Sequence, residues 1–213
     1  MRVAAAVLCF FGSLAPVSVQ AQRGPGRSWT LAPYIAASVA SPVGKRWGLS
    51  PDRRHLFLGL HTTIPLVVRG GWSFSYAPEL VPVLIVTNNP KYRVTPTDDG
   101  EVMVKESGRG PVAGFAVGPI GFEGRAPLSL KWSAFGAGAL GVVWFTRDVP
   151  ILNARLFNFT AEFGGGLLWR TRPQFALRLG YKFHHLSNAK TAPENPGIDG
   201  HVLLVGFERS FGR

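Results

Sequence analysis

Long stretches of this sequence alternate between apolar and polar residues, and this two-residue period limits the folds that the chain can adopt. In residues 175–187 the odd positions are mostly aromatic or aliphatic, whereas the even positions are mostly small or charged. Residues 155–169 and 202–211 repeat the pattern. Such a period is typical of β-strands, because successive side chains of a strand point to opposite faces. The alternation therefore predicts a chain built of β-strands.

Charged residues lie in the middle of these segments, opposite the aromatic stripes. They are Glu162, Arg178, Lys182 and Glu208. A soluble β-sandwich also alternates, but a β-barrel in lipid has an apolar outer surface and tolerates a polar interior. Beyond the N-terminus, no segment offers the 18 consecutive apolar residues of a membrane-spanning helix. We therefore expect an all-β fold, an eight-stranded antiparallel outer-membrane β-barrel.

Eight segments fit this pattern, and the connections between them differ in length. The segments are residues 29–40, 54–66, 71–87, 112–122, 128–146, 155–169, 174–187 and 199–211. Short connections lie near 67–70, 123–127 and 170–173, and long ones at 41–53, 88–111 and 188–198. Outer-membrane barrels have short periplasmic turns and longer outer loops, so we expect the 188–198 loop outside the cell. Aromatic residues near the strand ends are expected to form interfacial girdles: Trp29, Tyr34, Trp47, Trp72, Trp144 and Trp169.

The N-terminus has the three parts of a secretory signal peptide. Arg2 precedes an apolar run over residues 3–16, and Val19 and Ala21 occupy the positions that a signal peptidase reads. We expect removal of residues 1–21, which leaves residues 22–213 as a single β-barrel domain. Removal also takes away the one cysteine, Cys9, so we expect no disulfide within the domain.

The chain is basic, with 23 Lys and Arg residues against 12 Asp and Glu and a formal net charge of +11. The basic residues are scattered, so we expect no nucleic-acid partner; phosphorylated lipid head groups suit an exported basic barrel better. Gly136, Gly138 and Gly141 match the G-x-G-x-x-G pattern of dinucleotide sites, but they lie inside a predicted strand, so no cofactor is expected. The five histidines lack metal-ligand spacing, so no metal site is expected either.

Three residues with complementary chemistry converge at the outer end of the last two predicted strands. His185 and Ser187 are two residues apart and share the apolar, lipid-facing side, and the parity of Asp199 points it to the same side. A serine hydroxyl becomes nucleophilic when an imidazole takes its proton, and a carboxylate on the other ring nitrogen fixes the tautomer. The pattern indicates acyl-ester hydrolysis. The alternative is that His185 and Ser187 are ordinary amphipathic residues of a membrane interface.

Developing negative charge on the ester oxygen would need hydrogen-bond donors nearby. Asn188, Asn195 and the backbone amide of Gly197 lie in the loop that follows Ser187 and are the candidates.

The block from Phe183 to Asp199 resembles the signature of the PagL-type lipid A 3-O-deacylases, which are eight-stranded outer-membrane esterases often described as acyloxyacyl hydrolases. Residues 80–90 and 157–166 are similar to further stretches of that family. The resemblance implies that His185 and Ser187 form the catalytic pair.

The family places a Glu twelve residues after the serine, and Asp199 stands at that position with a side chain one methylene shorter. Glu194 is a weaker candidate for the acid, because it lies in the loop. The asparagine that the family has eight residues after the serine corresponds to Asn195, which the resemblance implies is the oxyanion or loop-ordering residue, with Asn188 second.

The leading hypothesis is a serine esterase of the cell outer membrane that removes an ester-linked 3-hydroxyacyl chain from lipid A of lipopolysaccharide. A non-catalytic small barrel with a structural, adhesive or lipid-binding role is the main alternative, and a soluble periplasmic ligand-binding barrel is the third. A homodimer is left open.

Overall fold

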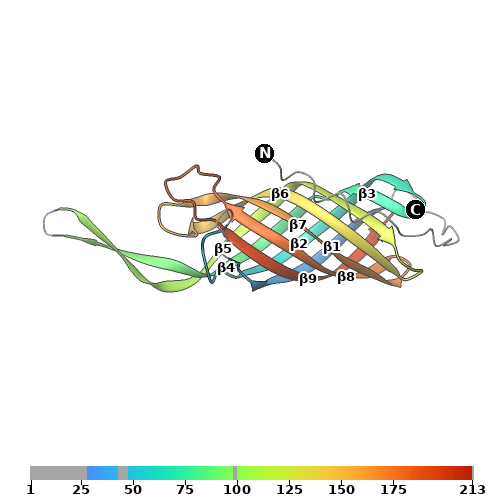
Figure 1. Ribbon diagram of the computed structural model, residues 1–213, viewed down its shortest axis with the longest axis horizontal. Helices are drawn as coiled ribbons and strands as arrows, with labels where there is room; N and C mark the ends of the chain where they lie inside the picture. The colour runs from blue at the N-terminus through green and yellow to red at the C-terminus, as the bar shows by residue number, and fades with distance from the viewer. Residues whose placement is uncertain (1–27, 43–47, 98–99, 213) are drawn as a thin grey trace, which may run out of the picture.

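The computed structural model describes residues 28–42, 48–97 and 100–212 as an antiparallel β-sheet (Figure 1). The predicted signal peptide lies outside these residues. The strands are β1 (Trp29–Ala40), β2 (His55–Arg69), β3 (Trp72–Tyr76), β4 (Glu79–Pro96), β5 (Val102–Pro127), β6 (Trp132–Val149), β7 (Arg155–Arg172), β8 (Phe175–Ser187) and β9 (Ile198–Phe211). In this described part of the chain, there is no helix that could cross a membrane.

The sheet closes on itself to form a barrel. β1 pairs with β2 on one side and with β9 on the other, where Trp29 lies opposite Phe211. β3 and β4 act as one strand, because both pair with β2 and with β5 and only residues 77–78 separate them. The nine elements therefore make a ring of eight antiparallel strands, which confirms the predicted fold class.

β4 and β5 continue past the barrel as a two-stranded ribbon, where the sequence predicts a loop over residues 88–111. Their pairing extends to Pro96 opposite Val102, and the ribbon projects from one end of the barrel (Figure 1). The prediction of a loop here is wrong. Residues 92–94 and 102–104 carry β-branched and aromatic side chains on either side of a turn, a hairpin pattern that outweighs the polar residues around it.

β5 also runs through residues 123–127, where the sequence predicts a short turn. Glu123 lies in the barrel interior, and Arg125 Nη1 donates to Glu208 Oε1 over 2.6 Å. These interior contacts hold the segment in the strand, and the turn falls at residues 128–131 instead. The local glycine and proline indicate a turn, but long-range ion pairing decides the conformation.

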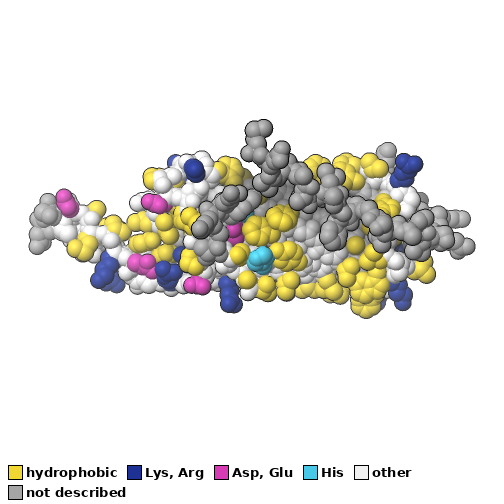
Figure 2. Space-filling view, in the orientation of Figure 1, with side chains coloured by type: hydrophobic (Ala, Val, Ile, Leu, Met, Phe, Trp, Pro, Cys, Tyr) yellow, Lys and Arg dark blue, Asp and Glu magenta, His cyan; other side chains and the backbone are white. Residues whose placement is uncertain are grey.

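Side chains alternate across the barrel wall as the sequence predicts. In β8, Leu179 and Tyr181 are exposed, whereas Arg178 and Lys182 are buried inside the barrel. Figure 2 shows hydrophobic side chains gathered over the wall and Lys and Arg side chains toward its ends and on the ribbon. This is the surface of a barrel that stands in lipid.

Exposed tryptophans mark two levels of this wall. Trp29, Trp72, Trp132, Trp144 and Trp169 are all at least one-third exposed. Trp132 and Trp169 stack at the end of the barrel where β1 begins and β9 ends, with ring centroids 5.9 Å apart. Trp144 lies near the other end of β6, roughly 40 Å farther along the strand, and a tilt of about 40° reduces this to roughly 30 Å, the thickness of a hydrocarbon core. The two levels have the spacing of membrane girdles.

Tyr34 does not belong to these girdles, contrary to the sequence prediction. Its side chain is buried inside the barrel, where the hydroxyl donates to Glu79 and its ring fills the space beside Gly59. The parity of Tyr34 in β1 sets this inward direction. Trp47 lies outside the described residues.

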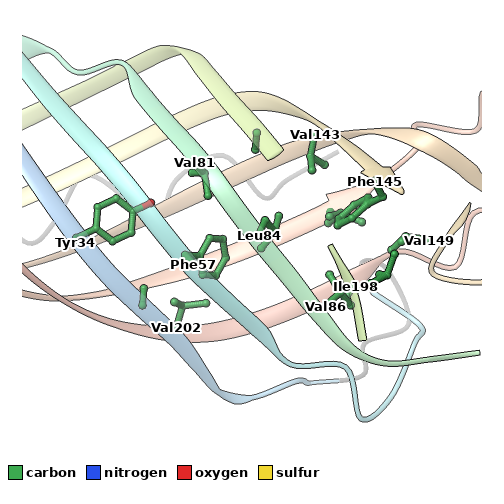
Figure 3. Packing of buried hydrophobic residues seen from close by; sticks show 14 residues of the cluster. Tyr34, Phe57, Val81, Leu84, Val86, Val143, Phe145, Val149, Ile198 and Val202 are labelled. Carbon is green, nitrogen blue, oxygen red and sulfur yellow. The ribbon is translucent and has the colours of Figure 1, made fainter. Parts of the chain in front are cut away.

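The barrel interior is packed with side chains. An apolar cluster fills the part near the ribbon, with Phe57, Leu84 and Phe145 among its members (Figure 3). Ion pairs fill further parts of the interior: Lys182 Nζ lies 2.8 Å from Glu162 Oε2 and 3.0 Å from Glu79 Oε1; Arg178 Nη2 lies 2.5 Å from Glu123 Oε2. Because buried charges need such partners, the interior tolerates the mid-strand charges that the sequence shows.

Candidate active site

His185 and Asp199 form a hydrogen-bonded pair on the outer side of the barrel wall. They lie directly opposite each other in β8 and β9, and His185 Nδ1 is 2.6 Å from Asp199 Oδ1. The His185 side chain is 17% exposed and that of Asp199 only 4%. The imidazole is thus accessible from the membrane side, while its carboxylate partner is shielded.

The pairing fixes the tautomer of the imidazole. A carboxylate can only accept hydrogen bonds, so the short contact places the proton on His185 Nδ1. In the neutral ring, Nε2 is then left as an acceptor. An imidazole held in this way by an acid is prepared to take a proton from a neighbouring hydroxyl.

Ser187 is the residue that this imidazole can reach along its own strand. It ends β8 two residues after His185, so both side chains leave the same face of the wall. Their Cα atoms are separated by roughly 6.8 Å of extended chain, a span that an imidazole and a hydroxymethyl group can bridge. Ser187 lies opposite Phe159 of β7 and is partly exposed. All three residues of the predicted set therefore lie on one side of the wall near its outer end.

Two described residues between β1 and β2, Ser41 and Gly48, cover Asp199. The backbone amide of Gly48 donates to Asp199 Oδ2 over 2.8 Å, and Ser41 Oγ donates to the Asp199 carbonyl over 2.9 Å. A Cβ atom on residue 48 would lie only 2.5 Å from the Asp199 backbone nitrogen, so this close approach requires glycine. Both carboxylate oxygens of Asp199 thus accept a hydrogen bond, Oδ1 from His185 and Oδ2 from Gly48. No local sequence signal points to Gly48, because 151 residues separate it from its partner.

Two backbone hydrogen bonds continue this contact along the loop before β9. The amides of Leu49 and Ser50 donate to the carbonyls of Pro196 and Gly197, over 2.6 and 3.3 Å. Gly197 adopts a φ of 62°, a conformation that glycine accepts readily. The candidate Gly197 is therefore buried where the two loops meet, two residues before the acid.

Side-chain amides order the loop between Ser187 and β9. Asn195 Oδ1 accepts from the backbone amide of Asn188 over 3.0 Å. The side-chain Nδ2 of Asn188 donates to the Glu194 backbone carbonyl over 2.7 Å. Asn195 keeps its Nδ2 as a donor, whereas Asn188 is fully buried and follows Ser187 on the opposite face. The Glu194 side chain is exposed in the loop.

A groove of about 420 Å³ runs over the outer surface of the wall beside His185. It follows two cross-strand rows of outward residues from β5 to β8; the rows are Ile120, Leu140, Ala161 and His185, and Phe122, Gly138, Phe163 and Phe183. Gly138 and Ala161 form low points between larger apolar side chains. A groove with these walls can take a hydrocarbon chain. In the described part of the chain, no group of His, Cys, Asp or Glu residues is arranged so that it could bind a metal ion.

A comparison with models of known protein families assigns the chain to one of them. The model of the lipid A 3-O-deacylase (PagL) family matches residues 102–208, half of the chain. The chain belongs to this family. The match contains His185, Ser187 and Asp199, so the resemblance that the sequence suggests is confirmed at the level of the family.

Solved structures give the same fold. The crystal structure of the outer membrane enzyme PagL superposes with a TM-score of 0.58 at 14% identity, covering 83% of this chain and 97% of that one. Neisserial surface protein A superposes with a TM-score of 0.50 at 10% identity, covering 87% and 98%. At these identities the likeness establishes the barrel fold and nothing further. No curated protein sequence matches the chain.

Proposed function

We propose that this protein is an outer-membrane esterase that hydrolyses an ester-linked 3-hydroxyacyl chain of lipid A, with Ser187 as nucleophile, His185 as general base and Asp199 as the orienting acid. The observation that carries the proposal is the His185–Asp199 hydrogen bond on the lipid-facing side of the wall, with Ser187 next on the same face. Membership of the lipid A 3-O-deacylase family supports the choice of substrate.

The reaction follows from this arrangement. His185 Nε2 takes the proton from Ser187 Oγ as the oxygen attacks the ester carbonyl carbon, and Asp199 stabilises the imidazolium through Nδ1. When the tetrahedral intermediate collapses, the sugar oxygen leaves with the proton from Nε2 and the acyl chain remains on Ser187. A water molecule, deprotonated by the same nitrogen, then attacks the acyl-serine and releases the fatty acid.

The tetrahedral intermediate carries a negative oxygen that needs donors. Asn195 Oδ1 accepts from the Asn188 backbone amide, and within residues 28–42, 48–97 and 100–212 no hydrogen bond engages Asn195 Nδ2, so this nitrogen is the side-chain donor of choice. The buried Gly197 amide beside Asp199 is a second donor. Asn188 is the least suitable of the three, because its own Nδ2 donates to Glu194.

The groove beside His185 would hold the acyl chain that is cleaved, because it is apolar and opens to lipid. Its floor includes Gly138, and a Cβ atom there would meet only the Glu162 carbonyl oxygen, at 3.6 Å. A larger side chain can therefore enter the groove without straining the wall.

Gly138→Leu should reduce kcat/KM for lipid A by about 10- to 100-fold, since the added side chain occupies space meant for the acyl chain. Hydrolysis of a short acetyl ester should change little. The matched control is Gly136→Leu, whose Cβ also has open space but which does not line the groove. Equal losses in the two variants, or no loss with Gly138→Leu, would contradict the role of the groove.

Surroundings of the site suit lipopolysaccharide as partner. Lys190 is exposed in the loop after Ser187 and could pair with head-group phosphates. The proposed location is the cell outer membrane, reached with the signal peptide expected at residues 1–21. Because all three catalytic groups come from one chain, the site needs no second subunit, and the homodimer finds no support.

The deciding experiment is to incubate the purified protein with lipid A in detergent and to weigh the products by mass spectrometry. We expect a lipid A product lighter by one 3-hydroxyacyl group and an equal amount of the free 3-hydroxy fatty acid. An unchanged lipid A mass with well-folded protein would favour the non-catalytic barrel instead.

A further inference from the structure

Tyr181 and His201 form a second polar pair on the lipid-facing wall. Tyr181 Oη is 2.6 Å from His201 Nδ1, and the two rings stack with centroids 5.8 Å apart. Tyr181 is the middle residue of the thirteen in β8 and is 38% exposed. The parity of His201 in β9, between Asp199 and Leu203, directs it to the same side.

This position is costly for polar groups. An ionisable side chain that faces hydrocarbon is expensive, and where one is found it indicates a functional site. Interfacial Tyr and Trp side chains normally lie at the two levels of the membrane surfaces, which Trp132 and Trp144 mark in β6. Tyr181 lies opposite Gly165, and Gly165 lies opposite Gly136, four residues from Trp132 and eight from Trp144. The pair therefore lies between the two levels, and an interfacial role does not account for it.

The hydrogen bond between the two side chains always leaves one donor free. If Tyr181 donates to Nδ1, the neutral His201 ring carries its proton on Nε2 and can donate from there. If His201 donates from Nδ1, the Tyr181 hydroxyl proton remains free. In either arrangement the pair presents a donor on a surface that otherwise contacts lipid, and it suits a hydroxyl or carbonyl oxygen.

The pair lies beside the acyl groove and is separated from it by one ring. Phe183 lines the groove, and its ring is 5.7 Å from that of His201 on the other side. His201 follows Asp199 by two residues, roughly 7 Å along the strand. The pair is thus close to the proposed catalytic site but faces the strip of wall next to the groove.

We propose that Tyr181 and His201 form a subsite that hydrogen-bonds a hydroxyl or carbonyl oxygen of a second acyl chain of the same lipid molecule, the chain that is not cleaved. This inference rests on the proposed function for its substrate class. Lipids that carry several acyl chains with polar oxygens would be selected over single-chain esters by this contact.

The test compares the wild type with Tyr181→Phe, His201→Leu and the double variant on two substrates, lipid A and a p-nitrophenyl ester of one fatty acid. For lipid A we expect KM to rise about tenfold with kcat unchanged, the effect of one lost hydrogen bond. For the single-chain ester, neither constant should change. Tyr76→Phe is the matched control, because it removes another outward tyrosine hydroxyl, which donates to the Pro119 carbonyl.

Unchanged KM for lipid A in the double variant would overturn the subsite, and so would equal losses on both substrates. Binding of lipid A to the same variants, each carrying Ser187→Ala, separates this result from a failure of the proposed function. Should the wild type leave lipid A intact, weaker binding by the double variant than by Tyr76→Phe would still support the subsite, and equal binding would overturn it.

Discussion

Ser187→Ala is expected to abolish the release of 3-hydroxy fatty acid from lipid A, with a fall in kcat of about 10⁶-fold. The methyl group cannot attack the ester, and the His185–Asp199 pair that remains has no nucleophile to activate. The measurement is the rate of fatty-acid release by mass spectrometry, with barrel folding followed by thermal unfolding in detergent.

The control for Ser187→Ala is Ser210→Ala, at the opposite end of the barrel near the end of β9. This variant should retain full activity. The two variants should unfold at the same temperature as the wild type, because neither hydroxyl lies in the buried ion-pair network. Undiminished release by Ser187→Ala would refute the assignment of the nucleophile.

Asp199→Asn should lower kcat/KM by about 10⁴-fold. An amide group can offer its NH₂ to His185 Nδ1, which favours the tautomer with the proton on Nε2, and that nitrogen can then no longer accept from Ser187. The amide oxygen can still accept from the Gly48 backbone, so the loop cover is retained. Asp199→Glu, unlike Asp199→Asn, keeps a carboxylate at this position. It should therefore keep most of the activity.

Glu194→Gln tests the rival acid in the same assay. The Glu194 side chain is exposed, whereas the Asp199 carboxylate hydrogen-bonds the imidazole, so Glu194→Gln should leave the rate unchanged. A large loss in Glu194→Gln together with an active Asp199→Asn would show that the acid is wrongly assigned.

Much of the barrel could be predicted from side-chain parity. In β8 the two-residue period separates Leu179 and Tyr181 from Arg178 and Lys182, and the structure places the first pair outside and the second inside. The prediction for Tyr34 is wrong because it rests on the residue type, whereas the parity of Tyr34 in β1 directs the side chain inward. The predicted loop over residues 88–111 is wrong because paired β-branched and aromatic residues extend β4 and β5 into a hairpin.

The local pattern also predicted which side of the wall His185 and Ser187 share, because two residues of one strand have a fixed relation. The register between β8 and β9, in contrast, could not be predicted from the local pattern. A shift by one residue would have moved Asp199 away from His185, and only the paired strands bring it opposite.

The sequence by itself determined the strand periodicity, the closed class of fold and the residue types of the candidate site, since these depend on the order of neighbours along one chain. Tertiary structure alone decided that the Gly48 amide hydrogen-bonds Asp199, that Arg125 pairs with Glu208 and so keeps β5 extended, and that Tyr181 hydrogen-bonds His201. These contacts join residues on different strands and loops, and their geometry depends on how the barrel closes.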